Sequence, residues 1–395
     1  MLAAEIKSLT DWLIDGARSE PNPAKMMAEA CERLVAAGLP LWRVGIFIRT
    51  LHPEIFGRRF IWKLGSEVEI GSVDFGFQDS AEFSNSPLSI VFREGIEVRV
   101  RADDPASKRF PIVDDLRAEG VTDYLALPLL FMNGEVQASS WTTRQSGGFT
   151  DNQTGALRRL IVPLARVIEI ISLQRTAALL LDTYVGNRAG ERILAGQIRR
   201  GHTETMHAAI WLSDLRGFTA LSDRLPSETV VDVLNRYFDC QVHAIRTHGG
   251  EVLKFMGDGL LAVFPIASDT ADAGEVCSGA LEAARESRAN VEAMHYPVGE
   301  TVERFRFGVA LHVGPILYGN IGGANRLDFT CIGPAVNLAA RLEKIAGRLS
   351  RTVVASAGFA ETCSAEWADL GEFPIAGFSQ PQRVYGLADE TALPV

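Results

Sequence analysis

The chain has 395 residues, of which 47% are hydrophobic and 22% charged, and it carries a net charge of −10 with a sequence pI of about 5.3. This length has room for two or three domains with sizeable cores, and the acidic balance argues against a broad nucleic-acid surface, which needs a basic face. The five cysteines are scattered without metal-ligand spacing, which predicts reduced thiols in a cytoplasmic protein. The apolar runs are shorter than the roughly 20 residues of a membrane span, and the N-terminus does not have the form of a signal peptide.

The first 170 residues alternate between helix and strand patterns. Apolar periodicity predicts helices over 23–37, 86–95, 110–120 and 152–174, and strands over 42–50, 58–64, 96–102, 123–131 and 136–143. This order predicts an antiparallel sheet with helices on its faces.

The stretch YLALPLLFMNGEVQASSWTTRQSGGFTDNQTGALRRLIVPLARVIEI resembles the last two strands and the closing helix of GAF sensory domains. The resemblance implies that residues 1–170 form a GAF-like sensory domain for a small-molecule or protein signal that the sequence does not identify. No cyclic-nucleotide-binding signature accompanies it. Cys31 lies in a predicted helix and is interpreted as a core residue rather than a chromophore anchor.

Residues 171–205 are predicted to be a helical connector. Apolar residues recur there at mostly three- and four-residue steps, a pattern that suits either pairing with a second copy of the helix or packing on its own domain. Gly186, Gly190 and Gly196 are expected to break the helix near its end.

The remaining chain begins with the apolar strand HAAIWLSDL, which contains Asp214. A helix is predicted over 225–250, a hairpin over 251–264 with Asp258 at its tip, a second helix over 270–294 and a strand over 304–314. This βαββαβ order predicts a ferredoxin-like palm, and the fold class of the whole chain is therefore α/β of the α+β kind.

Asp258 lies between two glycines, and turn chemistry alone could explain it, because Asp-Gly is a strong hairpin signal. In a βαββαβ unit, however, the first strand lies beside the hairpin, so Asp214 and Asp258 can meet at one edge of the sheet. Two close carboxylates repel one another unless cations lie between them, and Mg²⁺ typically binds one or two carboxylates together with substrate phosphates. The following segment LRGFTA offers free N–H groups at a helix start, which favour an anion.

Three segments, WLSDLRGFTALSD, EVLKFMGDGLLAVF and CIGPAVNLAARLE, resemble the signature segments of class III nucleotidyl cyclases. The resemblance covers about residues 205–388 and implies a catalytic domain over 206–390. Two such palms are expected to form a head-to-tail homodimer with active sites at the interface.

The resemblance also implies roles for individual residues. Two divalent ions, Mg²⁺ or Mn²⁺, are expected on the carboxylates of Asp214 and Asp258 and on the carbonyl of Leu215. The phosphates of the substrate are expected at the segment Gly217, Phe218 and Thr219.

Asn337 and Arg341 correspond to the residues that orient the ribose and stabilise charge on the α-phosphate. They stand at i and i+4, so both project from one helical face. The alternative for Arg341 is a surface arginine paired with Glu343 or Asp328.

Lys254 and Thr330 correspond to the two base-reading positions. Lys can donate toward adenine N1 and Thr can accept from the exocyclic amine, so the pair favours ATP over GTP. Guanylyl cyclases typically have Glu and Cys at these positions. The alternative for Lys254 is a solubility residue on an edge strand.

Two positions depart from the family. Pro334 stands where Asp is frequent, and proline is well tolerated at the first position of a helix. Ala376 stands where a basic residue holds phosphate, which implies weaker triphosphate binding or a substitute such as Arg348 or Arg351.

These residues predict an adenylyl cyclase that converts ATP to 3′,5′-cyclic AMP and pyrophosphate under control of the N-terminal domain. The alternatives are a guanylyl cyclase, or a catalytically weak nucleotide-binding signalling protein.

Overall fold

The computed structural model describes residues 2–18, 22–104, 109–267, 270–298 and 301–390. The chain divides into two compact units, Met1–Leu180 and Leu181–Val395. Helix α6 (Asp151–Val185) begins in the first unit and ends in the second.

The first unit contains a six-stranded antiparallel sheet in the order β3-β2-β1-β6-β5-β4. Its strands are β1 (Arg43–Arg49), β2 (Ile55–Lys63), β3 (Glu69–Asp74), β4 (Val98–Arg101), β5 (Asp123–Leu130) and β6 (Val136–Thr143). Its other elements are α1 (Leu2–Ile14), α2 (Pro23–Ala36), the 3₁₀ turn η1 (Phe75–Asp79), α3 (Ala81–Ser84), α4 (Pro87–Glu94), α5 (Pro111–Ala118) and α6.

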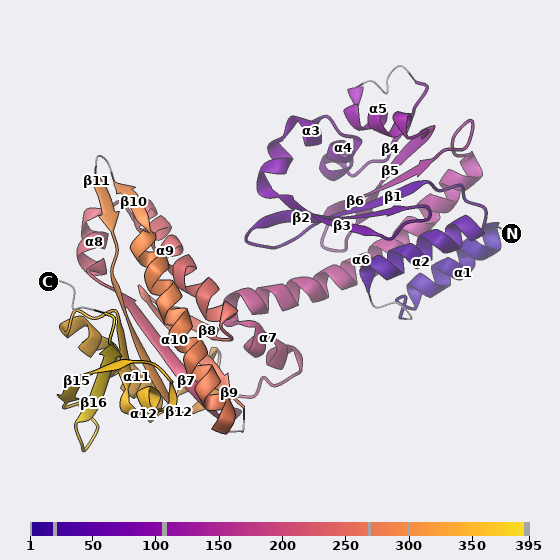
Figure 1. The fold of residues 1–395 in the computed structure, drawn as a ribbon. Coiled ribbons are helices and arrows are strands. Elements are labelled where there is room, and N and C mark those ends of the chain that lie inside the picture. Colours follow the sequence, from indigo (N-terminus) through magenta and orange to yellow (C-terminus); the bar gives the residue numbers. More distant parts are fainter. Residues whose placement is uncertain (1, 19–21, 105–108, 268–269, 299–300, 391–395) are drawn as a thin grey trace. The chain divides into compact units, whose positions relative to one another are not determined.

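Both faces of this sheet are covered (Figure 1). Along β5, Leu125 and Leu127 join the core that α1, α2 and α6 form on one face. Tyr124 and Ala126 point the other way, into the core formed with α4 and α5. This period-two alternation confirms the predicted antiparallel sheet with helices on its faces.

The connector differs in part from the prediction. Helix α6 ends at Val185, and Gly186 follows with φ 88°, a backbone conformation that favours glycine. Gly190 does not break the helical structure, because it lies inside α7 (Asn187–Leu194). A Cβ at Gly190 would lie 3.1 Å from the side chain of Leu181, so the missing side chain lets α7 pack closely on the end of α6.

The second unit contains an eight-stranded sheet in the order β15-β16-β14-β12-β7-β9-β8, with β13 paired to one end of β12. Its strands are β7 (Thr203–Leu215), β8 (Glu251–Met256), β9 (Gly259–Ile266), β12 (Phe307–Gly322), β13 (Leu327–Ile332), β14 (Val353–Ser356), β15 (Trp367–Phe373) and β16 (Gln382–Leu387), and a separate hairpin consists of β10 (His295–Val298) and β11 (Thr301–Arg304). Its helices are α7, α8 (Phe218–Arg224), α9 (Ser227–Thr247), α10 (Thr270–Ala293), α11 (Pro334–Arg348) and α12 (Ala357–Thr362).

The elements β7, α9, β8, β9, α10 and β12 follow one another in the predicted βαββαβ order. Strand β7 lies between β9 and β12 and is antiparallel to both, which is the arrangement of a ferredoxin-like palm. Residues of β7 alternate between two cores. Ala209 and Trp211 pack with α9 and α10, whereas Ala208 and Ile210 pack with α7 and α11.

Two further expectations concern the whole chain. Among the helices of the described residues, none has the length and apolarity needed to cross a membrane. All five cysteines are free thiols, which agrees with the expectation of reduced cysteines.

Candidate active site

Asp214 and Asp258 lie next to one another at the edge of the palm. The strand register pairs Asp214, near the end of β7, with Gly259, and Asp258 directly precedes that glycine in the β8–β9 turn. The pKa of Asp214 is raised to about 7, first by burial and then by the charges of Asp258 and Glu343. Gly257 has φ 67° in the turn, so the tight connection that brings the two carboxyl groups together depends on glycine.

This arrangement suits a hard divalent cation. Both side chains are half-buried, and the raised pKa of Asp214 reflects a site where negative charge lacks compensation. Leu215, whose carbonyl is the third predicted ligand, is buried and pairs with Phe307 of β12. Among the described residues, no group of three or more His, Cys, Asp or Glu side chains is arranged to hold a metal ion. Mg²⁺ typically binds one or two carboxylates together with substrate phosphates, a number that Asp214 and Asp258 supply.

An ion pair that sequence reasoning missed lies beside these carboxylates. The Nη1 atom of Arg216 lies 2.7 Å from Oε1 of Glu343, whose side chain is only 7% exposed. A Cβ at Gly308 would overlap the Arg216 guanidinium, and one at Gly347 would lie 2.9 Å from it. Two glycines therefore leave the space through which Arg216 reaches α11. Its positive charge lowers the pKa of Asp214, against the larger effects that raise it.

The predicted phosphate-binding segment begins helix α8. Gly217 is the N-cap residue of α8 with φ 71°, and no side chain caps the helix. Phe218 is the first helical residue and Thr219 is exposed beside it. The segment directly follows the strand that contains Asp214.

Lys254 lies on β8 and Thr330 on β13, two strands that contact one another although each pairs with a different strand. The Lys254 ammonium lies 2.9 Å from Oδ2 of Asp328, two residues before Thr330. Thr330 is 5% exposed, and its hydroxyl oxygen has no hydrogen-bond partner among the described residues. Cys331 points the other way and packs in the core with Phe329. A buried hydroxyl without a partner is costly, which is consistent with a site that a ligand completes.

Asn337 and Arg341 are exposed on α11. Both carboxylates considered as alternative partners of Arg341 are engaged elsewhere, because Glu343 pairs with Arg216 and Asp328 with Lys254. Within the described part of the chain, the guanidinium of Arg341 has no ion pair. A single chain therefore brings Asp214 close to Asp258, and Lys254 close to Thr330. Among the described residues, no contact links either pair to Asn337 or Arg341.

The two family departures have different consequences. Pro334 is the first residue of α11, as expected for a tolerated proline. Ala376 is exposed in the loop before β16 and offers no charge. Of the two substitutes considered, Arg351 donates to the carbonyl oxygens of Leu387 and Glu390, whereas Arg348 is exposed and without an ion pair among the described residues.

Comparison with known proteins agrees with this geometry. Residues 202–388 match the family model of the adenylate and guanylate cyclase catalytic domain. An uncharacterized protein of Mycobacterium tuberculosis is 34% identical over 186 residues, which are 46% of this chain and 33% of that protein. Adenylate cyclase 1 of Rhizobium meliloti is 31% identical over 177 residues, which are 44% of this chain and 26% of that protein. These matches span about a third or less of the relatives' lengths.

Among solved structures, the adenylyl cyclase CyaB from P. aeruginosa is similar at 28% identity and a TM-score of 0.40, covering 49% of this chain and 100% of that one. The family-model match identifies residues 202–388 as a class III nucleotidyl cyclase catalytic domain. The N-terminal antiparallel sheet is present, and its GAF identity stays a prediction.

Proposed function

We propose that this chain is an adenylyl cyclase that works as a homodimer and is regulated by its N-terminal sheet domain. The ribose 3′-hydroxyl of ATP attacks the α-phosphate in line. A bond forms between that oxygen and the α-phosphorus while the hydroxyl proton passes to water, the bond from the α-phosphorus to the bridging oxygen breaks, and pyrophosphate leaves with the electron pair. The products are 3′,5′-cyclic AMP and pyrophosphate.

The observation that carries this proposal is the adjacency of Asp214 and Asp258 within a cyclase catalytic domain. Two Mg²⁺ or Mn²⁺ ions bound there would lower the pKa of the 3′-hydroxyl and neutralise charge on the phosphates. Asp214 and Asp258 hold their position through the β7–β9 register and the β8–β9 turn. Arg216 keeps Glu343, the nearest further carboxylate, paired, so the two aspartates are the anionic groups free to bind cations.

Base selection is assigned to Lys254 and Thr330. The unpartnered Thr330 hydroxyl can accept from the exocyclic amine of adenine, and Lys254 can donate toward N1 once it leaves Asp328. Because an unfilled buried acceptor favours the base that supplies a donor, ATP is the preferred substrate.

Asn337 and Arg341 complete the site from the second copy of the chain. Arg341 is exposed and uncompensated in one chain, which suits a guanidinium that contacts phosphate oxygens across an interface. Exposed apolar side chains on β8 and on the β12–β13 hairpin, Phe255, Met256, Leu317, Leu327 and Ile332, support pairing at this side of the palm.

The test is product formation from ATP and from GTP, each with Mg²⁺ and with Mn²⁺. The wild type is expected to form cyclic AMP at a higher kcat/KM than cyclic GMP. Asp258→Ala is expected to lower the rate at least 100-fold, and Asp239→Ala, which removes an exposed carboxylate elsewhere on α9, is the matched control. Formation of cyclic GMP alone would overturn the substrate assignment. Absence of both products would support the alternative of a catalytically weak nucleotide-binding protein, which the missing basic residue at Ala376 suggests.

Regulation by the N-terminal domain rests on domain order. Removal of residues 1–170 is expected to change the basal rate, measured as cyclic AMP formed per catalytic domain. An unaltered rate and unaltered responses to added signals would contradict a sensory role.

A further inference from the structure

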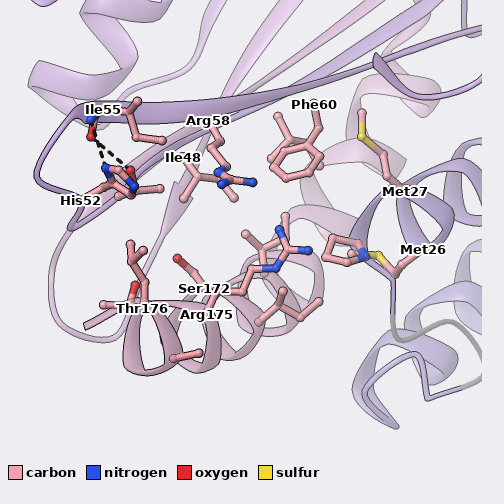
Figure 2. A pocket seen from close by; sticks show the side chains of 17 residues that line it. Met26, Met27, Ile48, His52, Ile55, Arg58, Phe60, Ser172, Arg175 and Thr176 are labelled. Carbon is pink, nitrogen blue, oxygen red and sulfur yellow. Dashed lines mark hydrogen bonds between the residues drawn. The ribbon is translucent and has the colours of Figure 1, made fainter. Parts of the chain in front are cut away.

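The N-terminal unit contains a cavity of about 290 Å³ between α2, the strands β1 and β2, and α6 (Figure 2). Its walls are mainly apolar and include the buried side chains Met26, Met27, Ile46, Phe60 and Ile168. The volume lies at the lower limit of the roughly 300–1,000 Å³ typical of small-molecule sites. The space suits a ligand with a compact apolar body.

Two arginines enter this space from different elements. Arg58 comes from β2 and Arg175 from α6, and Figure 2 shows both guanidinium groups directed into the gap between the strand and the helix. Both side chains are exposed, and neither guanidinium has an ion pair or hydrogen bond within the described ranges. No Asp or Glu is among the residues that line the cavity. The pKa of Arg175 is lowered from its ordinary value, first by burial and then by the charge of Arg58.

Two guanidinium groups near one another repel, and no carboxylate among the described residues that line the cavity offsets their charge. An anion bound between them would relieve this repulsion. Some arginines of this unit have carboxylate partners, such as Arg99 with Asp123 at 2.7 Å and Arg158 with Glu97 at 2.7 Å. Arg58 and Arg175 have none among the described residues, and they differ from other unpaired arginines of the unit because both lie at the mouth of an apolar cavity. Guanidinium groups bind carboxylates through paired, charge-assisted hydrogen bonds.

The cavity also offers hydrogen-bonding groups near its mouth. Ser172 and Thr176 contribute hydroxyls from α6 on the side of Arg175. The Nδ1 atom of His52 accepts the backbone N–H groups of Glu54 and Ile55 at 3.0 and 3.3 Å, which leaves Nε2 as the N–H donor of the neutral ring. An anionic head group would therefore find donors besides the two guanidinium groups.

We propose that this cavity binds a small monocarboxylate amphiphile, with its apolar body against Met26, Met27 and Phe60 and its carboxylate between Arg58 and Arg175. The site lies wholly within the N-terminal unit and requires no catalytic residue. The proposal is therefore independent of the proposed cyclase activity, although a ligand that binds α6 would be well placed to act as its signal.

A second copy of this chain is the main competing occupant. The exposed large hydrophobic residues of α6 that could pair with another helix are Val162, Ile170, Leu173, Leu180 and Tyr184. None of them lines the cavity. A helix–helix contact could thus use α6 without filling the space between Arg58 and Arg175.

The test is calorimetric titration of the full chain with octanoate, 1-octanol and acetate. Octanoate is expected to bind saturably at one site, with at least tenfold higher affinity than 1-octanol, which lacks the charge, and than acetate, which lacks the apolar body. Arg58→Gln and Arg175→Gln are each expected to weaken octanoate binding at least tenfold, because a charge-assisted hydrogen bond is lost. Arg159→Gln, which removes an exposed arginine of α6 outside the cavity, is the control and is expected to change the affinity less than twofold.

A second variant tests the cavity without altering its charge. Ser172→Phe fills part of the space and is expected to abolish octanoate binding while circular dichroism and the thermal midpoint without ligand stay close to wild type. Equal affinities for octanoate and 1-octanol, undiminished binding in both arginine variants, or no saturable octanoate binding to the wild type would each overturn the proposal. A change of sedimentation coefficient in Ser172→Phe, with octanoate binding retained, would assign the cavity to an interface between copies instead.

Discussion

Base selection depends on two side chains whose environment is specific to this chain. The ammonium of Lys254 is held by Asp328, and the Thr330 hydroxyl is buried without a partner. We predict that Lys254→Glu combined with Thr330→Cys shifts the ratio of kcat/KM values toward GTP by at least tenfold. Glu can accept from the N1–H of guanine where adenine presents an acceptor, and the Cys thiol can donate toward guanine O6 where adenine presents an amine. The measurement is cyclic AMP and cyclic GMP formation by the purified double variant. An unchanged ratio would mean that other residues read the base.

A second residue-scale prediction concerns Arg216. Removal of one partner from a buried ion pair typically costs about 3–5 kcal/mol, whereas replacing both with apolar groups is often neutral. Arg216→Met is therefore expected to lower the free energy of unfolding by a few kcal/mol. The double variant Arg216→Met with Glu343→Met is expected to recover most of that loss.

Urea denaturation of the wild type, both single variants and the double variant gives the coupling free energy of the two residues. The Arg216 variant should also need less Mg²⁺ for half-maximal activity, since losing the positive charge beside Asp214 and Asp258 leaves an uncompensated Glu343 carboxylate that attracts cations. Additive losses in the four proteins would show that the pair does not act as a unit.

At the scale of elements, the palm could be predicted because the local sequence patterns of its strands and helices agree with the structure that tertiary contacts favour. Strand β7 and the β8–β9 hairpin are apolar runs bounded by turn residues, and α9 and α10 have helical periodicity between them. The βαββαβ order then determines which strand ends are adjacent. This order is why the proximity of Asp214 and Asp258 could be predicted from the sequence. The antiparallel sheet of the first unit followed in the same way.

Other elements could not be predicted by these patterns. Strand β3 is largely exposed, so EIGSVD has no apolar alternation, and the pairs β10–β11 and β12–β13 depend on partners rather than on propensity. The Arg216–Glu343 pair joins residues 127 positions apart. The pair can form because Gly308 and Gly347 have no side chains and leave space for the Arg216 guanidinium. No local sequence pattern predicts this.

Strand β12 carries a pH-sensitive contact with β14. The pKa of His312 is lowered to about 4, first by burial and then by the charge of His207. The Nδ1 atom of His312 lies 2.7 Å from the hydroxyl oxygen of Ser356, which accepts the N–H of Phe359. The direction of this hydrogen bond depends on the tautomer of His312, and the lowered pKa keeps the ring neutral in either tautomer.

The unfolded chain takes up a proton on His312 near pH 6.5, before the folded chain does near pH 4. Stability from the neutral ring is thus complete above pH 6.5 and is lost as the pH falls toward 4, with a slope of at most about 1.4 kcal/mol per pH unit. We predict that His312→Gln loses less stability than the wild type between pH 7 and pH 5, measured by urea denaturation. Parallel losses in the two proteins would assign the acid sensitivity to other groups.

At the scale of the whole molecule, the predicted site residues of one chain form separate groups that do not contact one another among the described residues. Asp214 and Asp258 lie at one edge of the palm, whereas Asn337 and Arg341 face solvent from α11. If a catalytic site draws the aspartates from one copy and Arg341 from the other, two inactive variants can restore each other. Asp258→Ala mixed with Arg341→Ala would then create dimers in which one site carries both substitutions and the other carries none.

If equal amounts of the two variants exchange subunits freely, half of the dimers contain one copy of each variant. Each of these mixed dimers has one intact site out of two. The expected activity is therefore about a quarter of the wild-type rate at the same total concentration, provided that the dimer has twofold symmetry. The measurement is cyclic AMP formation after co-expression of the two variants with different affinity tags, with each variant alone as the control. Activity no higher than that of the single variants would mean that each chain builds its site by itself, because only a shared site can be repaired by exchanging partners.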